Sequence, residues 1–311
     1  MSQRSRYRPR RSCLSTPGSS ERFLAKAPVS VADFSFLDLE DSVAPDEKVD
    51  ARDKVVRAIR DLHWDDRVLC VRLNGWQSPW TYADVLAVVG HAGERLDEVM
   101  LPKVRRAADV VALDLLLSQV ELNVGLPSGH VGIEAQIESA EGLINVEEIC
   151  GASSRLESIV FGPADFAASI AMPVTTIDDS IHDAPSNPFS YAFAKILVAG
   201  RAHGLHVIDG PYLKVRDLEG LKRSASISAS YGFDGKWALT PDQAIILNDV
   251  YSPSQDLFDR SYEILDAYQV ATRETSSGAV MFGDEMIDEA SAKMAQSFVA
   301  RGLRAGMTRS T

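Results

Sequence analysis

Two carboxylates in the middle of the chain have the surroundings of a magnesium site. Glu138 follows the short run AQI, and Asp165 follows the run GPA. Neither has a histidine or cysteine beside it, and no two of the six histidines have the HxxxH spacing of a zinc site. Carboxylate oxygens without soft ligands favour Mg²⁺, with Mn²⁺ as a substitute, over Zn²⁺. The pair therefore predicts a site for a hard divalent cation.

Four more charged side chains stand where other apolar runs end. They are Glu40, Asp41, Arg72 and Lys103. A group of unpaired like charges is costly, and a bound cation relieves that cost. All six residues together predict one charged site. The competing interpretation is structural: Glu138 would form an ion pair with Arg72 or Lys103 and do no chemistry.

Eight apolar runs must position these residues. The runs are Ser12–Gly18, Phe34–Asp41, Val68–Asn74, Glu98–Val104, Val131–Ser139, Ser158–Asp165, His206–Tyr212 and Tyr231–Leu239. Near-continuous apolar runs are typical of parallel strands that are covered on both faces. The runs end roughly 25 to 45 residues apart, with helical stretches such as 48–61 and 188–202 between them, which is the spacing of βα units.

Eight βα units predict an α/β protein with a (β/α)8 (TIM) barrel. A doubly wound sheet is the alternative, but no GxGxxG motif follows the first run. In a barrel the carboxyl ends of all strands meet at one rim, and active sites lie there. The fold therefore explains how charges far apart in the sequence come together.

Two segments flank the predicted barrel, which spans residues 12–249. Residues 1–11 carry five arginines and no acidic residue, which indicates a disordered or anion-contacting basic arm. After Pro241 the periodicity turns helical, so residues 250–311 are expected to form a C-terminal helical lid. The Gly/Ser break at residues 276–278 is its expected hinge.

Composition excludes several classes of partner. A net charge of −12 disfavours nucleic acid, because phosphate binding depends on clustered lysine and arginine. No apolar run approaches the roughly 20 residues that a membrane span requires. Cys13, Cys70 and Cys150 are widely spaced without a CxxC motif, so we expect buried, reduced thiols and a cytoplasmic setting.

Several sequence blocks resemble the citrate lyase β-subunit-like family of CoA ester lyases, most closely its malyl-CoA and β-methylmalyl-CoA lyases. The blocks are RSCLSTPGS (11–19), LDLEDSVAPDEKVDAR (37–52), VRLN (71–74), LPKV (101–104), QIESAEGLINVEEI (136–149), VFGPADFAASIAMP (160–173), GFDGKWALTPDQ (232–243) and EMIDEA (285–290). They occur in order over nearly the whole chain. The LDLEDSV, IESA and FGPAD blocks are the specific ones, whereas LPKV alone is weak.

The resemblance implies a metal site and an acid/base. It implies a barrel with a C-terminal lid, assembled as a homotrimer or a dimer of trimers. Glu138 and Asp165 correspond to the family's Mg²⁺ ligands, and Arg72 corresponds to its strand-three arginine. Asp288, in the M-I-D motif, corresponds to the acid/base that a neighbouring subunit supplies.

The resemblance also implies a binding site for coenzyme A. It lies around the first strand and the P-G-S loop, where Ser15, Ser20, Arg22 and Lys26 are the candidate contacts. Relatives often have an arginine directly after P-G-S, whereas this chain has Ser20, so Arg22 is the expected replacement.

The expected reaction is the reversible cleavage of a β-hydroxyacyl-CoA to an acyl-CoA and a 2-oxo acid such as glyoxylate or pyruvate. The candidate substrates are malyl-CoA, β-methylmalyl-CoA and citramalyl-CoA. Arg72 would face the developing enolate oxygen, Asp288 would move the proton, and Glu40 and Asp41 would support Arg72 and metal-bound water. Three alternatives remain open: a Schiff-base aldolase that uses Lys103, a subunit acting on an acyl-carrier-protein thioester, and a malyl-CoA thioesterase.

Overall fold

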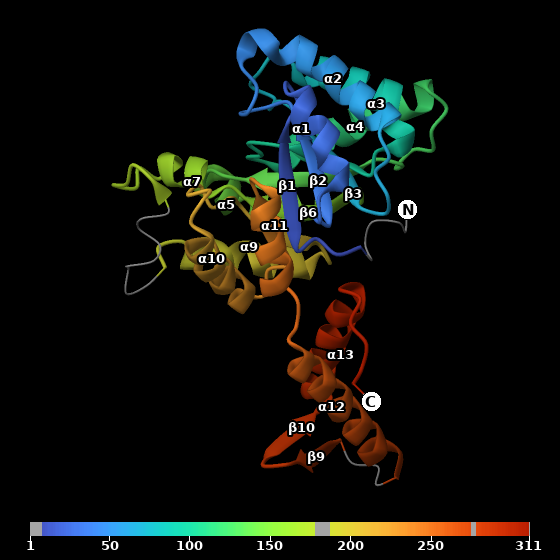
Figure 1. The fold of residues 1–311 in the computed structure, drawn as a ribbon, viewed down its shortest axis with the longest axis vertical. Helices are drawn as coiled ribbons and strands as arrows, with labels where there is room; N and C mark the ends of the chain where they lie inside the picture. Colours follow the sequence, from blue (N-terminus) through green and yellow to red (C-terminus); the bar gives the residue numbers. More distant parts are fainter. Residues whose placement is uncertain (1–7, 178–186, 275–277, 311) are drawn as a thin grey trace. The chain divides into compact units, whose positions relative to one another are not determined.

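The computed structural model describes residues 8–177, 187–274 and 278–310 (Figure 1). Residues 1–7 of the expected basic arm, and residues 276 and 277 of the expected hinge, lie outside these ranges. The chain divides into two compact units, one ending at Tyr251 and one beginning at Ser252. No helix within the described ranges is long and apolar enough to cross a membrane.

Eight parallel strands close into a barrel in the order of the sequence, which confirms the predicted (β/α)8 fold (Figure 1). The strands are β1 (Ser12–Pro17), β2 (Phe34–Asp38), β3 (Val68–Arg72), β4 (Glu98–Leu101), β5 (Gly132–Ile137), β6 (Leu156–Phe161), β7 (His206–Asp209) and β8 (Gly235–Ala238). Neighbouring strands pair in parallel all the way round, from β1 with β2 to β8 with β1. The carboxyl ends of the strands therefore form one rim.

Helices follow the strands and cover the outside of the barrel. They are α1 (Glu21–Lys26), α2 (Lys48–Asp61), α3 (Thr81–Ala92), α4 (Ala107–Asn123), α5 (Ala140–Ile144), α6 (Val146–Cys150), α7 (Pro163–Ser169), α9 (Ser190–Ala202), α10 (Leu218–Tyr231) and α11 (Pro241–Val250). The long helical stretch predicted at 48–61 matches α2 residue for residue. Most of the buried apolar side chains lie between strands and helices, so this layer is the larger core.

A second core fills the inside of the barrel. Along each strand the side chains alternate between the two cores, because successive residues of a strand point to opposite faces. The inward set is Cys13, Phe34, Phe36, Val68, Cys70, Met100, Val160, Ile208 and Trp237. All three cysteines are buried and free, as predicted.

The strands are shorter than the predicted runs, and this changes the position of one site residue. β6 ends at Phe161, and Asp165 lies four residues further on, in the first turn of α7. The prediction that Asp165 ends a strand is therefore wrong. Gly162 and Pro163 cause the early end, because the proline starts a helix at its first position.

The amino-terminal end of the barrel is closed by an ion cluster in which Arg10, Glu98 and Glu134 are buried and Glu157 is partly exposed. Arg10 lies beside Glu98 (Nη1 to Oε1, 2.7 Å) and Glu157 (Nη2 to Oε2, 3.3 Å), with Glu134 at 3.8 Å. Residues 8–11 are therefore not a disordered arm, because they pack against the base of the barrel. Burial and the neighbouring Glu98 raise the pKa of Glu134 to about 7.

The C-terminal unit contains a small sheet that helical periodicity does not predict. Its elements are α12 (Gln255–Glu274), the antiparallel pair β9 (Ala279–Phe282) and β10 (Glu285–Asp288), and α13 (Glu289–Arg304). Phe258 of α12 is fully buried, and a Cβ on Gly302 of α13 would lie 2.1 Å from its ring. The two helices approach closely because Gly302 has no side chain.

Arg10→Met should lower the free energy of unfolding at pH 7.5 by about 3–5 kcal/mol, because it leaves buried carboxylates without their cation. Part of the loss should return at pH 5. The pKa of Glu134 is raised in the folded state, so its protonated form is favoured there, and the cost grows as pH rises through about 7. Urea unfolding at both pH values measures this.

Arg8→Met is the matched control for this variant. Arg8 pairs with Asp97, and both side chains are about one-fifth exposed, so water can replace the lost partner. We expect a smaller loss and no recovery at pH 5. Equal losses in the two variants would show that the buried carboxylates do not depend on Arg10.

Candidate active site

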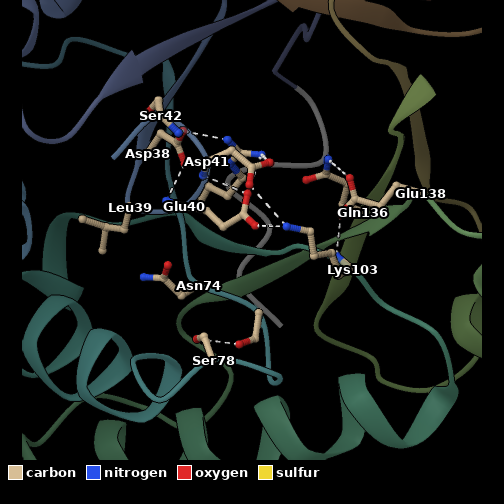
Figure 2. Close-up of polar contacts among 12 residues, drawn as sticks. Asp38, Leu39, Glu40, Asp41, Ser42, Asn74, Ser78, Lys103, Gln136 and Glu138 are labelled. Carbon is tan, nitrogen blue, oxygen red and sulfur yellow. Dashed lines mark hydrogen bonds and ion pairs between the residues drawn. The ribbon is translucent and has the colours of Figure 1, made fainter. Parts of the chain in front are cut away.

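An acidic turn after β2 brings three carboxylates to the rim of the barrel. Asp38 ends β2, is fully buried, and accepts hydrogen bonds from the backbone N–H groups of Glu40 (2.9 Å) and Ser42 (3.1 Å). This local bonding is the type that aspartate makes in turns. The buried ammonium of Lys48 donates to the carbonyl oxygens of Leu39 (2.9 Å) and Glu40 (2.7 Å). These hydrogen bonds to Asp38 and from Lys48 fix the conformation of the turn that carries Glu40 and Asp41. Figure 2 shows this turn beside Lys103.

Arg72 ends the neighbouring strand β3 and lies in register with Asp38. Its guanidinium forms a two-pronged pair with that carboxylate, through Nε (2.7 Å) and Nη2 (2.6 Å). Nη1 lies 3.1 Å from Glu40 and 3.7 Å from Asp41. Burial alone would lower the pKa of Arg72, but the carboxylate of Asp38 outweighs it and raises that pKa. Arg72 is therefore a permanent cation in a fixed orientation.

Lys103 connects the acidic turn with Glu138 (Figure 2). Its ammonium pairs with Glu40 and with Asp41, the latter at 3.3 Å. Its own backbone is left-handed, with φ of 55°, and its N–H donates to Oε1 of Glu138 at 2.6 Å. A left-handed lysine is strained, and such strain is typical of functional sites. Burial lowers the pKa of the Lys103 ammonium, but the Glu40 hydrogen bond and charge raise it overall.

Glu138 directly follows β5 and is only 3% exposed. Besides the Lys103 N–H, it accepts a hydrogen bond from Nε2 of Gln136 at 2.6 Å. A Cβ on Gly162 would lie 2.7 Å from Oε2 of Glu138, so only glycine leaves room for this carboxylate. Burial and the charge of Asp165 raise the pKa of Glu138 to about 8. Asp165 itself lies on α7 and is exposed.

Glu138 makes no side-chain ion pair within the described ranges. Arg72 pairs with the carboxylates of the acidic turn, and so does Lys103. The predicted ion pair of Glu138 with Arg72 or Lys103 is therefore wrong for the described residues. No group of three or more histidine, cysteine or acidic side chains suited to a metal occurs among the described residues. A site here would have two protein carboxylates, which is the usual number for Mg²⁺ that retains water and binds substrate oxygens.

The charges of this rim do not balance. When all five carboxylates (Asp38, Glu40, Asp41, Glu138 and Asp165) are ionised, they exceed the three cations (Arg72, Lys103 and Lys48) by two negative charges. A proton on Glu138, whose pKa is raised to about 8, relieves one of these charges when no metal is bound. The buried Oε1 atom of Gln136 also has no hydrogen-bond donor among the described residues. A hydrated divalent cation would neutralise the excess and could supply that donor. The residues present therefore fit Mg²⁺.

The residues expected to bind coenzyme A lie at the same rim. Ser15 follows the inward Cys13 by two positions on β1, so it faces the barrel mouth, where it is half-buried. The N–H of Gly18 donates to the carbonyl of Asp38 (2.8 Å), which places the P-G-S loop beside the acidic turn. A Cβ on Gly18 would lie 2.6 Å from that oxygen, so this contact requires glycine.

The other three candidates for this role belong to α1 or its start. Ser20 caps the helix and accepts from the N–H of Phe23 at 3.4 Å. Arg22 is exposed and lies over the ring of Phe23, and Lys26 is exposed in the last turn. Two exposed cations on one short helix suit the phosphates of a nucleotide.

Asp288 belongs to the C-terminal unit, at the junction of β10 and α13. It caps α13, since Oδ1 accepts hydrogen bonds from the N–H (3.0 Å) and the hydroxyl (3.2 Å) of Ser291. The Ser291 N–H is also the main cause that lowers the pKa of Asp288.

Four residues of the site were not predicted from the sequence: Asp38, Lys48, Gln136 and Gly162. Strand alternation could have found Asp38, because it is the inward residue two positions after Phe36. Alternation could also have found Gln136, because it lies two positions before Glu138 and therefore faces the same side of β5. Nothing local marks Lys48 or Gly162, whose roles depend on contacts with the ends of other elements.

Comparisons with known proteins agree with this geometry. The chain is 40% identical over 301 residues to an L-malyl-CoA/beta-methylmalyl-CoA lyase of Cereibacter sphaeroides, with 94% of each chain covered. It is 34% identical over 275 residues to a (3S)-malyl-CoA thioesterase of the same species, with 88% of each covered.

Among solved structures, the protein CitE of Mycobacterium tuberculosis in complex with magnesium, acetoacetate and coenzyme A matches with a TM-score of 0.75. Its identity to this chain is 26%, and the match covers 97% of this chain and 99% of CitE. The pattern of the family described as HpcH/HpaI aldolase/citrate lyase matches residues 11–241. The chain belongs to this family and is a carbon–carbon lyase.

Proposed function

We propose that the protein is a Mg²⁺-dependent lyase that reversibly cleaves a β-hydroxyacyl-CoA of the malyl-CoA, β-methylmalyl-CoA or citramalyl-CoA type. The products are an acyl-CoA and a 2-oxo acid such as glyoxylate or pyruvate. The observation that carries the proposal is the buried carboxylate of Glu138, which accepts hydrogen bonds but has no ion-pair partner among the described residues, at a rim where carboxylates outnumber cations. The likeness to a malyl-CoA/β-methylmalyl-CoA lyase over 94% of the chain supports the choice of substrate.

Glu138 and Asp165 would hold the cation. When bound, Mg²⁺ supplies a Lewis acid that polarises the oxygens of the oxo acid. Lys103 and Gln136 hold the Glu138 carboxylate through one hydrogen bond to each oxygen, so its position is set before any ligand enters. Pre-set ligands lower the cost of organising the site.

Arg72 would stabilise the enolate oxygen that develops when the Cα–Cβ bond breaks. Its fork is fixed on Asp38 and Glu40, so it need not reorganise as the charge develops. Glu40 and Asp41 would orient Arg72 and accept hydrogen bonds from water on the metal. Asp288 would take the hydroxyl proton during cleavage and return one during condensation.

Coenzyme A would lie along β1, the P-G-S loop and α1. Arg22 and Lys26 would contact its phosphates, with Ser15 and Ser20 nearer the thioester. Gly18 fixes this loop against the end of β2, so the thioester would reach Arg72 from the same side of the rim.

A Schiff-base aldolase is less well supported. Its nucleophile would have to be neutral, but two carboxylates pair with the Lys103 ammonium and its pKa is raised. The thioesterase remains a second candidate, because a malyl-CoA thioesterase is 34% identical to this chain. A subunit acting on an acyl-carrier-protein thioester has no specific contact in its favour.

With Mg²⁺, a panel of malyl-, β-methylmalyl- and citramalyl-CoA should yield acyl-CoA plus 2-oxo acid by mass spectrometry, and EDTA should stop turnover. Glu138→Gln and Asp165→Asn should abolish turnover and weaken Mg²⁺ binding at least tenfold in titration calorimetry. Glu148→Gln, on the exposed face of α6, is the control and should change neither. Release of free malate and CoA would establish the thioesterase, and wild-type Mg²⁺ affinity in both variants would remove the metal assignment.

Arg72→Lys should lower kcat about a hundredfold with little change in KM, because lysine cannot make the two-pronged contact with Asp38 or present a planar donor to the enolate. Steady-state kinetics measures the split. Arg105→Lys, at an exposed position near the same rim, should match the wild type. A rise in KM alone would make Arg72 a binding residue for the ground state.

The resemblance to the family further leads us to propose a homotrimer, or a dimer of trimers, in which Asp288 serves a neighbour's barrel. Pure Asp288→Ala and pure Glu138→Ala oligomers should both be inactive. Co-assembled in equal amounts, they should recover about a quarter of wild-type activity, since one interface in four pairs an intact metal site with an intact Asp288. Mixtures as inactive as their parents would place Asp288 in its own chain's site or outside the chemistry.

A further inference from the structure

Trp237 occupies the inside of the barrel, directly beneath the charged rim. It lies in the middle of β8, is 4% exposed, and belongs to the inward core. Its ring packs on Phe36, with 4.5 Å between ring centroids. The guanidinium carbon of Arg72 lies 5.3 Å from the centre of the same ring. The indole therefore forms the floor on which the cation of the site rests.

The indole N–H of Trp237 has no acceptor among the described residues. Trp64 and Trp76, by contrast, donate to the carbonyl oxygens of Ala58 and Asp109, each at 3.0 Å. A buried donor without a partner is costly, and tryptophans in protein interiors usually find one. Phenylalanine would fill much of the same space at no such cost. The N–H therefore points to an acceptor that belongs to a ligand.

We propose that Trp237 is a substrate-contacting residue, whose Nε1–H donates a hydrogen bond to an anionic oxygen of the substrate held beside Arg72. This inference rests on the proposed function and extends it to a residue on β8. The ring face supports Arg72, and the ring edge supplies a second, uncharged donor. A neutral donor adds stabilisation to an oxyanion without adding a charge that must be neutralised when the site is empty.

The anionic oxygen can come from either half of the substrate. One source is the enolate oxygen of the acyl-CoA, which is charged only during the reaction. The other is an oxygen of the 2-oxo acid, which carries its charge in the ground state as well. The two sources predict different effects of a substitution at Trp237. Only a contact with the 2-oxo acid would change the affinity of the site for a stable anion.

Trp237→Phe removes the N–H and keeps an aromatic ring, and Trp64→Phe is the matched control. Both remove the same atoms from a buried position, but only Trp64 has a partner in the protein. Relative to Trp64→Phe, Trp237→Phe should have the higher melting temperature, because no bond within the protein is lost. Its kcat should fall about ten- to a hundredfold, whereas the control should keep wild-type kcat.

Titration of oxalate in the presence of Mg²⁺ distinguishes the two sources of the oxygen. A tenfold weaker oxalate affinity in Trp237→Phe assigns the contact to the oxo acid, and a lower kcat with unchanged oxalate affinity assigns it to the enolate. If the wild type lacks lyase turnover, the proposed function fails, and the oxalate affinity alone decides the role of Trp237. The inference is overturned if Trp237→Phe keeps both the kcat and the oxalate affinity of the wild type. If the wild type is inactive, an oxalate affinity that is unchanged in Trp237→Phe overturns it.

Discussion

The paired side chains of Asp38 and Arg72 are the interaction on which the rest of the site depends. They end two neighbouring strands in register, so the backbone pairing of β2 and β3 is enough to place them side by side. Each carboxylate oxygen of Asp38 accepts two hydrogen bonds, one from Arg72 and one from a backbone N–H of the acidic turn. One buried carboxylate thus orients the cation and also sets the direction of Glu40 and Asp41. Because the pair is buried, its hydrogen bonds are hardly weakened by water.

The two ends of the barrel carry charge in different ways. At the amino-terminal end, the Arg10 cation lies among three carboxylates, and the raised pKa values of Glu98 and Glu134 favour protons there that offset the remaining charge. At the carboxyl end, Gly162 and the left-handed backbone of Lys103 leave room for the Glu138 carboxylate, which no cation of the described residues pairs with. The first arrangement closes the barrel and needs no ligand. The second leaves negative charge and hydrogen-bond donors for a metal and an anionic substrate. This difference distinguishes the Arg10 cluster, which is structural, from the rim, which is the candidate active site.

The part of the site that was predictable follows from strand endings. Arg72 ends β3, Glu138 directly follows β5, and Glu40 and Asp41 lie in the turn after β2, all at the mouth of the barrel. The part that was missed depends on contacts between elements. Lys48 acts through backbone carbonyls that belong to another element, and Gly162 acts by leaving a space for Glu138. No residue pattern shows these contacts, because they form only when α2 packs beside the turn after β2 and when β6 pairs with β5.

The sequence by itself determined the barrel, the identity of most charged residues at its rim, and the oxygen-rich character of the candidate metal site. It could do so because strand burial leaves a continuous apolar pattern and charges interrupt that pattern at strand ends. Only the tertiary structure decided which charges pair. Arg72 and Lys103 form ion pairs with the carboxylates of the acidic turn, and Glu138 accepts only hydrogen bonds. Pairing depends on distances of a few ångströms across the barrel, which strand twist, closure and packing set together.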